Sequence, residues 1–374
     1  MLLRTRMGLL LFAALIVFAA LSGVVMAQET ETFTSEVPMP MPRMAVDRPL
    51  FVGYVCPTMA WESSQRQWHH IQIEMEHRGW KMTSIRNAET GDKQRDALSS
   101  FINQNVDAMV LSNLEMEQVT DLIIEARNKG IGVYVVDNEV RDGVFVSTTQ
   151  PNGIVGMQMF YWGLNNMIEN ERGKVLAVTR KGHKNAGPRC YPVVSVIENF
   201  YPALEMVGFE DLPMPGWEKA SFDIAVNYLT RYGDELSWVF GGWDQPAMFA
   251  ARAIEQAGYT KDEIFTTGID GGAQAYADIR KGTPFVASMS QSFELFVHEC
   301  LEVIDQIQVK GIGPEDKDSI VPEGRYIYCD PALSTIKTLP PVGSSIHEVF
   351  AGTYYDSDDK DAWYFWGDPY RLQG

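Results

Sequence analysis

Short apolar segments alternate with amphipathic segments along most of this chain, and this alternation limits the fold more than any other feature. The apolar pattern predicts strands over 50–56, 81–87, 107–112, 132–136, 143–148, 173–179, 206–209, 236–242, 264–269 and 286–291. Most of the segments between them have a helical pattern, over 63–78, 93–104, 116–128, 154–170, 195–201, 222–232, 247–257 and 292–309. Strands that alternate with helices form a parallel sheet covered by helices on both faces, so we expect an α/β protein.

The alternation occurs as two similar arrays, which meet near 148–152 and again near residue 291. We therefore expect two similar doubly wound parallel-sheet lobes joined by a multi-strand hinge. The N-terminal lobe is assigned residues 49–148 plus 292–312, and the C-terminal lobe residues 149–291 plus 313–340. Two lobes with more than one crossing form a cleft between them, which suits hinge closure around a ligand.

The first 27 residues have the composition of a secretory signal peptide. Arg4 and Arg6 precede a nearly unbroken apolar run over 7–25, and the small residue Ala27 offers a cleavage site. We expect cleavage near Ala27 and a periplasmic or otherwise extracytoplasmic location. The alternative is an uncleaved N-terminal membrane anchor, because the run approaches the roughly 20 residues that a membrane span needs. Residues 28–48 are rich in Thr, Glu, Pro and Met and are expected to form a flexible leader.

The chain carries a formal net charge of −18, and loss of the signal peptide would bring it to about −20. Binding of nucleic acid needs a basic surface that neutralises phosphates, so the charge argues against a nucleic-acid partner. The aromatic tail, residues 341–374, is expected to pack on a lobe or on a partner, because so many aromatic rings do not stay in solvent. A lid over the ligand is the alternative role for the tail.

Four cysteines follow the signal peptide, namely Cys56, Cys190, Cys300 and Cys329. In an exported chain they allow three disulfide pairings, and the sequence does not choose among these and buried free thiols. Their spacing matches no zinc motif, and the chain has no Walker, G-x-S-x-G or H-E-x-x-H motif. We therefore expect no metal, no cofactor and no enzymatic activity.

Aromatic, amide and charged residues instead gather at the carboxyl ends of the predicted strands. Ligands of open α/β sheets bind outside the carboxyl ends of the strands. Flat indoles suit the C–H faces of a sugar, and charged or amide groups suit its hydroxyls. A single Asp at such a position is more often a helix cap, but the whole set favours binding. The candidate ligand-binding residues are Trp61, Asp137, Asn138, Arg189, Trp217, Trp243, Asp244, Asp270 and Gln291.

Several of these segments resemble the periplasmic sugar-binding proteins of the ribose/galactose-binding type, over about residues 48–335. The matching segments are Val52–Thr58, Gly79-Trp80, Val135–Asn138, Val239–Gln245, Thr267–Gly271 and Ala287–Gln291. The resemblance implies a type I periplasmic binding protein fold and the role of substrate-binding component of an ABC importer, with a membrane permease as partner. It implies that Asp137 and Asp270 contact the ligand and that Gln291 lies at a hinge crossing. Trp217 and Arg189 fall near the family's stacking aromatic and its binding arginine.

The chain departs from the family pattern at three ligand positions. Trp61 and Trp243 stand where the family has asparagine, and Asn138 stands where it commonly has arginine. These departures imply a ligand other than ribose: another monosaccharide, a polyol or a cyclitol, with a partly apolar ligand as a further option. We expect the mature protein to be a monomer that binds such a carbohydrate-like ligand.

Three alternatives share part of this pattern. A sensory module for a chemoreceptor or histidine kinase would have the same lobes. An exported glycoside-acting enzyme would use paired carboxylates such as Asp244 and Asp270. A sugar-responsive repressor would need an N-terminal helix-turn-helix, whereas the N-terminus here has the signal-peptide pattern.

Overall fold

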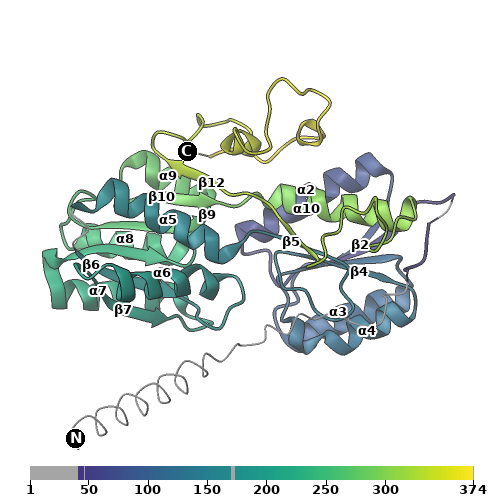
Figure 1. Ribbon diagram of the computed structural model, residues 1–374, viewed down its shortest axis with the longest axis horizontal. Helices are drawn as coiled ribbons and strands as arrows, with labels where there is room; N and C mark the ends of the chain where they lie inside the picture. The colour runs from purple at the N-terminus through teal and green to yellow at the C-terminus, as the bar shows by residue number, and fades with distance from the viewer. Residues whose placement is uncertain (1–40, 46, 170–172, 374) are drawn as a thin grey trace, which may run out of the picture. The chain divides into compact units, whose positions relative to one another are not determined.

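Residues 41–45, 47–169 and 173–373 are described by the computed structural model (Figure 1). The predicted signal peptide and the leader up to residue 40 lie outside these residues. The described chain contains two six-stranded sheets, one in each lobe. The strands of the first sheet are β1 (Phe51–Val55), β2 (Lys81–Ile85), β3 (Ala108–Ser112), β4 (Gly132–Val136), β5 (Ser147–Thr149) and β11 (Tyr326–Tyr328). Those of the second are β6 (Gly173–Thr179), β7 (Leu204–Asp211), β8 (Leu236–Gly241), β9 (Phe265–Asp270), β10 (Phe285–Ser290) and β12 (Ala332–Thr335).

Helices cover both faces of each sheet (Figure 1). The first sheet is flanked by α2 (Glu62–Arg78), α3 (Gly91–Gln104), α4 (Thr120–Asn128) and α10 (Phe293–Ile304). The second is flanked by α5 (Asn152–Met167), α6 (Ala186–Phe200), α7 (Trp217–Tyr232), α8 (Asp244–Gln256) and α9 (Ala273–Lys281). Short helical turns complete the structure: η2 (Met116–Gln118), η4 (Gly233–Glu235), η5 (Asp305–Val309), η6 (Ile346–Phe350) and η7 (Trp363–Phe365).

The two sheets have the same strand order. The first runs β2-β1-β3-β4-β5-β11 and the second runs β7-β6-β8-β9-β10-β12. All neighbouring strands are parallel except β12, which pairs antiparallel with β10. The predicted fold class, two similar doubly wound α/β lobes, is therefore confirmed.

The chain passes between the two sheets three times among the described residues, from β5 to α5, from β10 to α10 and from β11 to β12. The first two crossings lie where the sequence places them. The third corrects the expected division, because the region 313–340 was assigned to the C-terminal lobe whereas β11 pairs with β5 in the first sheet. Within this region it is β12 that pairs with the second sheet.

Local sequence signals explain where several elements begin and end. Helix α2 ends at Gly79, which adopts a φ of 65° that glycine tolerates without strain. Helix α3 begins after Thr90, whose side chain accepts a hydrogen bond from the Lys93 amide. Strand β1 has a glycine at Gly53 because a Cβ there would lie 2.8 Å from the Phe101 ring. The predicted helix over 116–128 is instead the turn η2 followed by α4.

The tail packs against both lobes. On the second lobe, Ile346 and Phe350 of η6 are buried with Tyr276 of α9, and Arg280 donates hydrogen bonds to the carbonyl oxygens of Pro340 (2.7 Å) and Gln373 (2.9 Å).

On the first lobe, the tail lies against α2 and α10. The Trp363 ring stacks on His298 with 4.5 Å between ring centroids, and the Trp366 ring stacks on His77 at 3.5 Å. The imidazole of His69 hydrogen-bonds the carbonyl oxygen of Asp368 at 2.6 Å. The tail is thus a strap between the lobes, and the expectation that its aromatic rings pack on the protein is confirmed.

The four cysteines of the chain are buried free thiols, so none of the three possible disulfide pairings is present. Within the described ranges, no helix combines the length and the apolar character required to cross a membrane. Nor do those ranges bring His, Cys, Asp and Glu side chains together in a group suited to a metal ion.

Candidate functional site

The carboxyl ends of the strands place the predicted residues at one edge of each sheet. Asp137 follows β4, Asp270 ends β9 and Gln291 follows β10. Trp61 and Trp243 directly precede α2 and α8, and Trp217 is the first residue of α7.

Three strand-end residues have unusual backbone conformations. Asn113, Asp137 and Asp270 have φ angles of 52°, 52° and 141°. Such conformations cost free energy in residues other than glycine and are concentrated at functional sites.

A cavity of about 160 Å³ is lined by residues of both lobes. Of the predicted binding residues, it brings together Trp61, Asp137, Arg189, Trp217, Trp243, Asp244, Asp270 and Gln291. Other lining residues include Glu62, Arg66, Asn113, Arg180, His183, Asn185, Met214, Met248 and Phe293. None of the described tail residues, 341–373, is among the lining residues.

Asn138 is not among the residues that line this cavity. Its amide nitrogen donates to the Leu114 carbonyl oxygen at 2.7 Å, and its side-chain oxygen accepts from the Glu139 amide at 2.8 Å. The side chain of Asn138 therefore stabilises the turn after β4.

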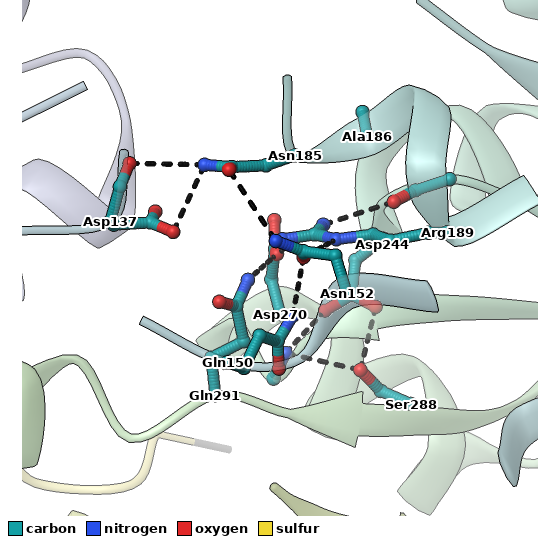
Figure 2. A network of polar contacts seen from close by, with 12 residues as sticks. Asp137, Gln150, Asn152, Asn185, Ala186, Arg189, Asp244, Asp270, Ser288 and Gln291 are labelled. Carbon is teal, nitrogen blue, oxygen red and sulfur yellow. Dashed lines mark hydrogen bonds and ion pairs between the residues drawn. The ribbon is translucent and has the colours of Figure 1, made fainter. Parts of the chain in front are cut away.

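Arg189 and Asp270 form an ion pair in the cavity wall, in which Arg189 is buried and the Asp270 side chain is 24% exposed (Figure 2). The Arg189 Nη1 donates to the Asp270 Oδ1 at 2.9 Å and to the Gly242 carbonyl oxygen at 3.0 Å. Its Nε donates to the Asn152 Oδ1 at 2.8 Å, and the Gln291 amide donates to the same Asp270 oxygen. These contacts fix the orientation of the Arg189 guanidinium and the Asp270 carboxylate before any ligand is bound.

Asp244 has a different environment, because both of its carboxylate oxygens already accept hydrogen bonds. Its Oδ1 accepts from the Ser288 hydroxyl at 2.7 Å, and its Oδ2 accepts from the amides of Gly271 (2.8 Å) and Gly272 (3.1 Å). It thus holds the loop after β9 in place and does not cap its own helix, α8. Burial and, second, the negative charge of Asp270 raise the pKa of Asp244 to about 7.

Burial also shifts the pKa values of other lining groups. It raises the pKa of both Asp137 and Asp270, although the positive charge of Arg189 opposes the shift in each case. It lowers the pKa of His183 to about 4, an effect to which Arg189 and Arg180 add. His183 is therefore neutral near pH 7.

Asn185 is a site residue that the sequence reasoning missed. It precedes α6 in the second lobe, and its amide nitrogen lies 3.0 Å from both the main-chain oxygen and the Oδ1 of Asp137 in the first lobe (Figure 2). Asn113 was missed as well; its amide donates to the other Asp137 carboxylate oxygen at 3.1 Å. Asn113 directly follows β3, so the expectation that ligands bind at the carboxyl ends of strands could have identified it. No periodic pattern in the sequence marks Asn185.

A second set of contacts joins the lobes beside the cavity. The Glu62 carboxylate on α2 accepts from the Ala273 amide at the N-terminus of α9, at 2.8 and 3.0 Å. The buried Arg66 on the same helix pairs with Glu294 at 2.6 and 2.8 Å and donates to the Gly271 carbonyl oxygen at 3.2 Å. The contacts with Ala273 and Gly271 join α2 to the second lobe, whereas Glu294 lies on α10 of the first lobe and holds Arg66 in place.

Aromatic and sulfur-containing side chains line the less polar part of the cavity. The rings of Trp217 and Trp243 meet edge to face with their centroids 5.8 Å apart, and Phe249 packs against Trp217 at the same distance. Met214, Met248 and Phe293 are further lining residues. The cavity thus combines apolar surfaces with a fixed set of charged and amide groups.

Comparison with known proteins agrees with this architecture. Residues 69–310 match the family model described as a periplasmic binding protein domain. The ribose import binding protein of Bacillus subtilis is 24% identical over 243 residues, which cover 63% of this chain and 74% of that protein.

Solved structures of sugar-transport proteins have the same fold. An ABC transporter solute-binding protein from Agrobacterium vitis, solved with bound allitol, gives a TM-score of 0.67 at 18% identity, covering 78% of this chain and 96% of that one. The arabinose ABC transporter binding protein from Shewanella, solved with L-arabinofuranose, gives a TM-score of 0.66 at 20% identity and covers 77% of this chain and 92% of its own. A sugar ABC transporter protein from Yersinia enterocolitica gives a TM-score of 0.69 at 16% identity and covers 85% of this chain and 93% of its own. The chain therefore belongs to the periplasmic binding protein family.

Proposed function

We propose that this protein is the substrate-binding component of an ABC importer and that it encloses a small sugar, polyol or cyclitol between its two lobes. Family membership supports this role. Similar proteins include a ribose import binding protein and two ABC transporter binding proteins solved with allitol or arabinofuranose.

The observation that carries the proposal is the meeting of polar side chains from both lobes at one cavity. Asp137 comes from the first lobe, and Arg189 and Asp270 come from the second. A hydroxylated ligand between them would contact both lobes at once and would therefore favour the closed arrangement.

We assign the roles in the cavity by chemistry. Trp61, Trp217 and Trp243 offer apolar surfaces to the C–H faces of the ligand, while Asp137, Arg189, Asp270 and Gln291 bind its hydroxyls. Asp244 is a positioning residue, because its oxygens are already occupied by Ser288 and the two glycine amides. An occupied Asp244 also argues against a hydrolase that uses Asp244 and Asp270 as paired carboxylates.

The proposal extends to processing and partners. The signal-peptide pattern of residues 1–27 supports export and cleavage near Ala27. The mature protein would work outside the cytoplasm as a monomer and release its ligand, unchanged, to a membrane permease.

A thermal-shift screen of the mature protein, residues 28–374, against monosaccharides, polyols and cyclitols tests the function. A ligand of the native state raises the melting temperature as its concentration increases. We expect at least one compound to do so, and we expect the shift to disappear in Asp270→Ala and Trp243→Ala. Asp262→Ala is the control, because Asp262 is exposed and outside the cavity. Full affinity in the two cavity variants would contradict the site, and the absence of any hit would contradict the function.

A further inference from the structure

Aspartate carboxylates outnumber the basic side chains that pair with them in the cavity wall. Asp137, Asp244 and Asp270 all line it, and Asp137 is only 4% exposed. Among the described residues, Arg189 is the one cation within ion-pair distance of any of these three carboxylates, and it contacts Asp270. Within the part of the chain that the structure describes, the donors to the Asp137 carboxylate are the neutral side chains of Asn113, Asn185 and Thr149.

The other basic residues of the wall are already paired or uncharged. Arg66 is bound by both oxygens of Glu294, and Arg180 lies 3.8 Å from Glu115. His183 is neutral near pH 7, as described above. The excess negative charge around Asp137 and Asp270 is therefore not compensated by the described protein.

A buried oxygen beside these carboxylates also lacks a donor. Gln291 is 1% exposed, and its Oε1 has no hydrogen-bond partner. The orientation of the amide is fixed, because its nitrogen must face the Asp270 carboxylate, to which it donates. A buried acceptor without a donor costs about 1–3 kcal/mol, so this oxygen is a place for a donor of the ligand.

We propose that the ligand carries a protonated amine among its hydroxyls, as an amino sugar or an aminocyclitol does. This inference rests on the proposed function and names its substrate class. An ammonium group has three donors and no acceptor, which matches a wall of carboxylate and amide oxygens. A hydroxyl can donate to the same oxygens but leaves the excess charge buried. The indole faces of the cavity also attract cations.

Calorimetric titration at pH 7 with matched pairs of compounds tests the substrate class. Each pair consists of an amine and the same scaffold with a hydroxyl in its place: glucosamine and glucose, galactosamine and galactose, and an amino-inositol and the parent inositol. N-acetylglucosamine keeps the nitrogen without its charge. We expect the amine of at least one pair to bind about 10-fold or more tightly than its neutral partners, since charged hydrogen bonds are roughly twice as strong.

Variants then test whether the preference depends on the excess charge. Asp137→Asn removes the unpaired carboxylate at nearly constant shape, and we expect it to abolish the preference for the amine. Asp262→Asn makes the same change at an exposed position and should leave the preference intact.

Three results would overturn the substrate class, and the first two leave the proposed function standing. Neutral compounds that bind as tightly as their amines, or more tightly, would contradict it and leave the proposed function standing. The same holds if no compound of the pairs binds while a neutral sugar or polyol of the wider screen does. If nothing in either set binds, the substrate class and the proposed function both fail.

Discussion

The amide of Asn185 donates to two oxygens of Asp137 at 3.0 Å each, and this contact joins the second lobe to the first at the cavity wall. Both residues are buried, at 7% and 4% exposure, so solvent does not compete for the contact. Opening of the lobes would break it, and it is therefore part of the closed state.

Replacing Asn185 should weaken ligand binding through the closed state. Asn185→Asp would set a second carboxylate beside the Asp137 oxygens, so we expect a larger loss than in Asn185→Ala, about 10-fold or more in Kd. Calorimetric titration with the tightest ligand measures this, and Asn199→Asp, at an exposed helical position, is the matched control. Equal affinity in Asn185→Asp and the native protein would show that the contact does not support binding.

Glu62 should contribute to closure from the other side of the cavity. Glu62→Gln keeps the shape of the side chain but removes its negative charge from the N-terminus of α9. A negative charge at a helix N-terminus contributes about 0.3–1 kcal/mol of stabilisation. We expect Kd to rise about 2- to 5-fold. Glu76→Gln alters an exposed carboxylate on the same helix and should have no effect. A similar loss in both variants would point to overall charge and not to the contact with Ala273.

The pKa of Asp244 leads to a pH-dependent stability. Its folded-state value of about 7 lies above the ordinary 3.8, so the folded protein holds a proton that the unfolded chain releases between these values. This contribution to stability is fully present below about pH 4 and is lost as the pH rises through about 7. Without ligand, the melting temperature of the native protein minus that of Asp244→Asn should therefore fall from pH 4 to pH 7. A difference that rises over this range would contradict the assignment.

The tail should stabilise the protein by bridging the lobes. Trp363→Ala removes the ring that stacks on His298 and packs against His70 at 5.1 Å, so we expect a loss of about 1–3 kcal/mol in the free energy of unfolding. Urea unfolding measures the loss. Phe200→Ala removes an aromatic ring that is 73% exposed and should change little. An unchanged unfolding midpoint in Trp363→Ala would mean that the strap carries no stability.

The sequence was informative where a periodic pattern determines position. Asp137, Asp270 and Gln291 follow buried strands, and parallel strands bring their carboxyl ends to a common edge. Asn138 follows the same strand as Asp137, but its side chain forms hydrogen bonds within the turn and does not line the cavity.

Other features depend on tertiary contacts that a single sequence does not reveal. Asn185 lies in a long loop whose path is fixed by packing, and no pattern points to it. The short strand β11 was assigned to the wrong lobe because its three residues have no signal that chooses between two sheet edges.

The most direct test of the account is a crystal structure of the mature protein with the tightest ligand of the thermal-shift screen. We predict that the ligand lies between the lobes, in hydrogen-bond contact with Asp137 and Asp270 and against the Trp243 ring. A ligand bound at another place, with this cavity empty, would contradict the account.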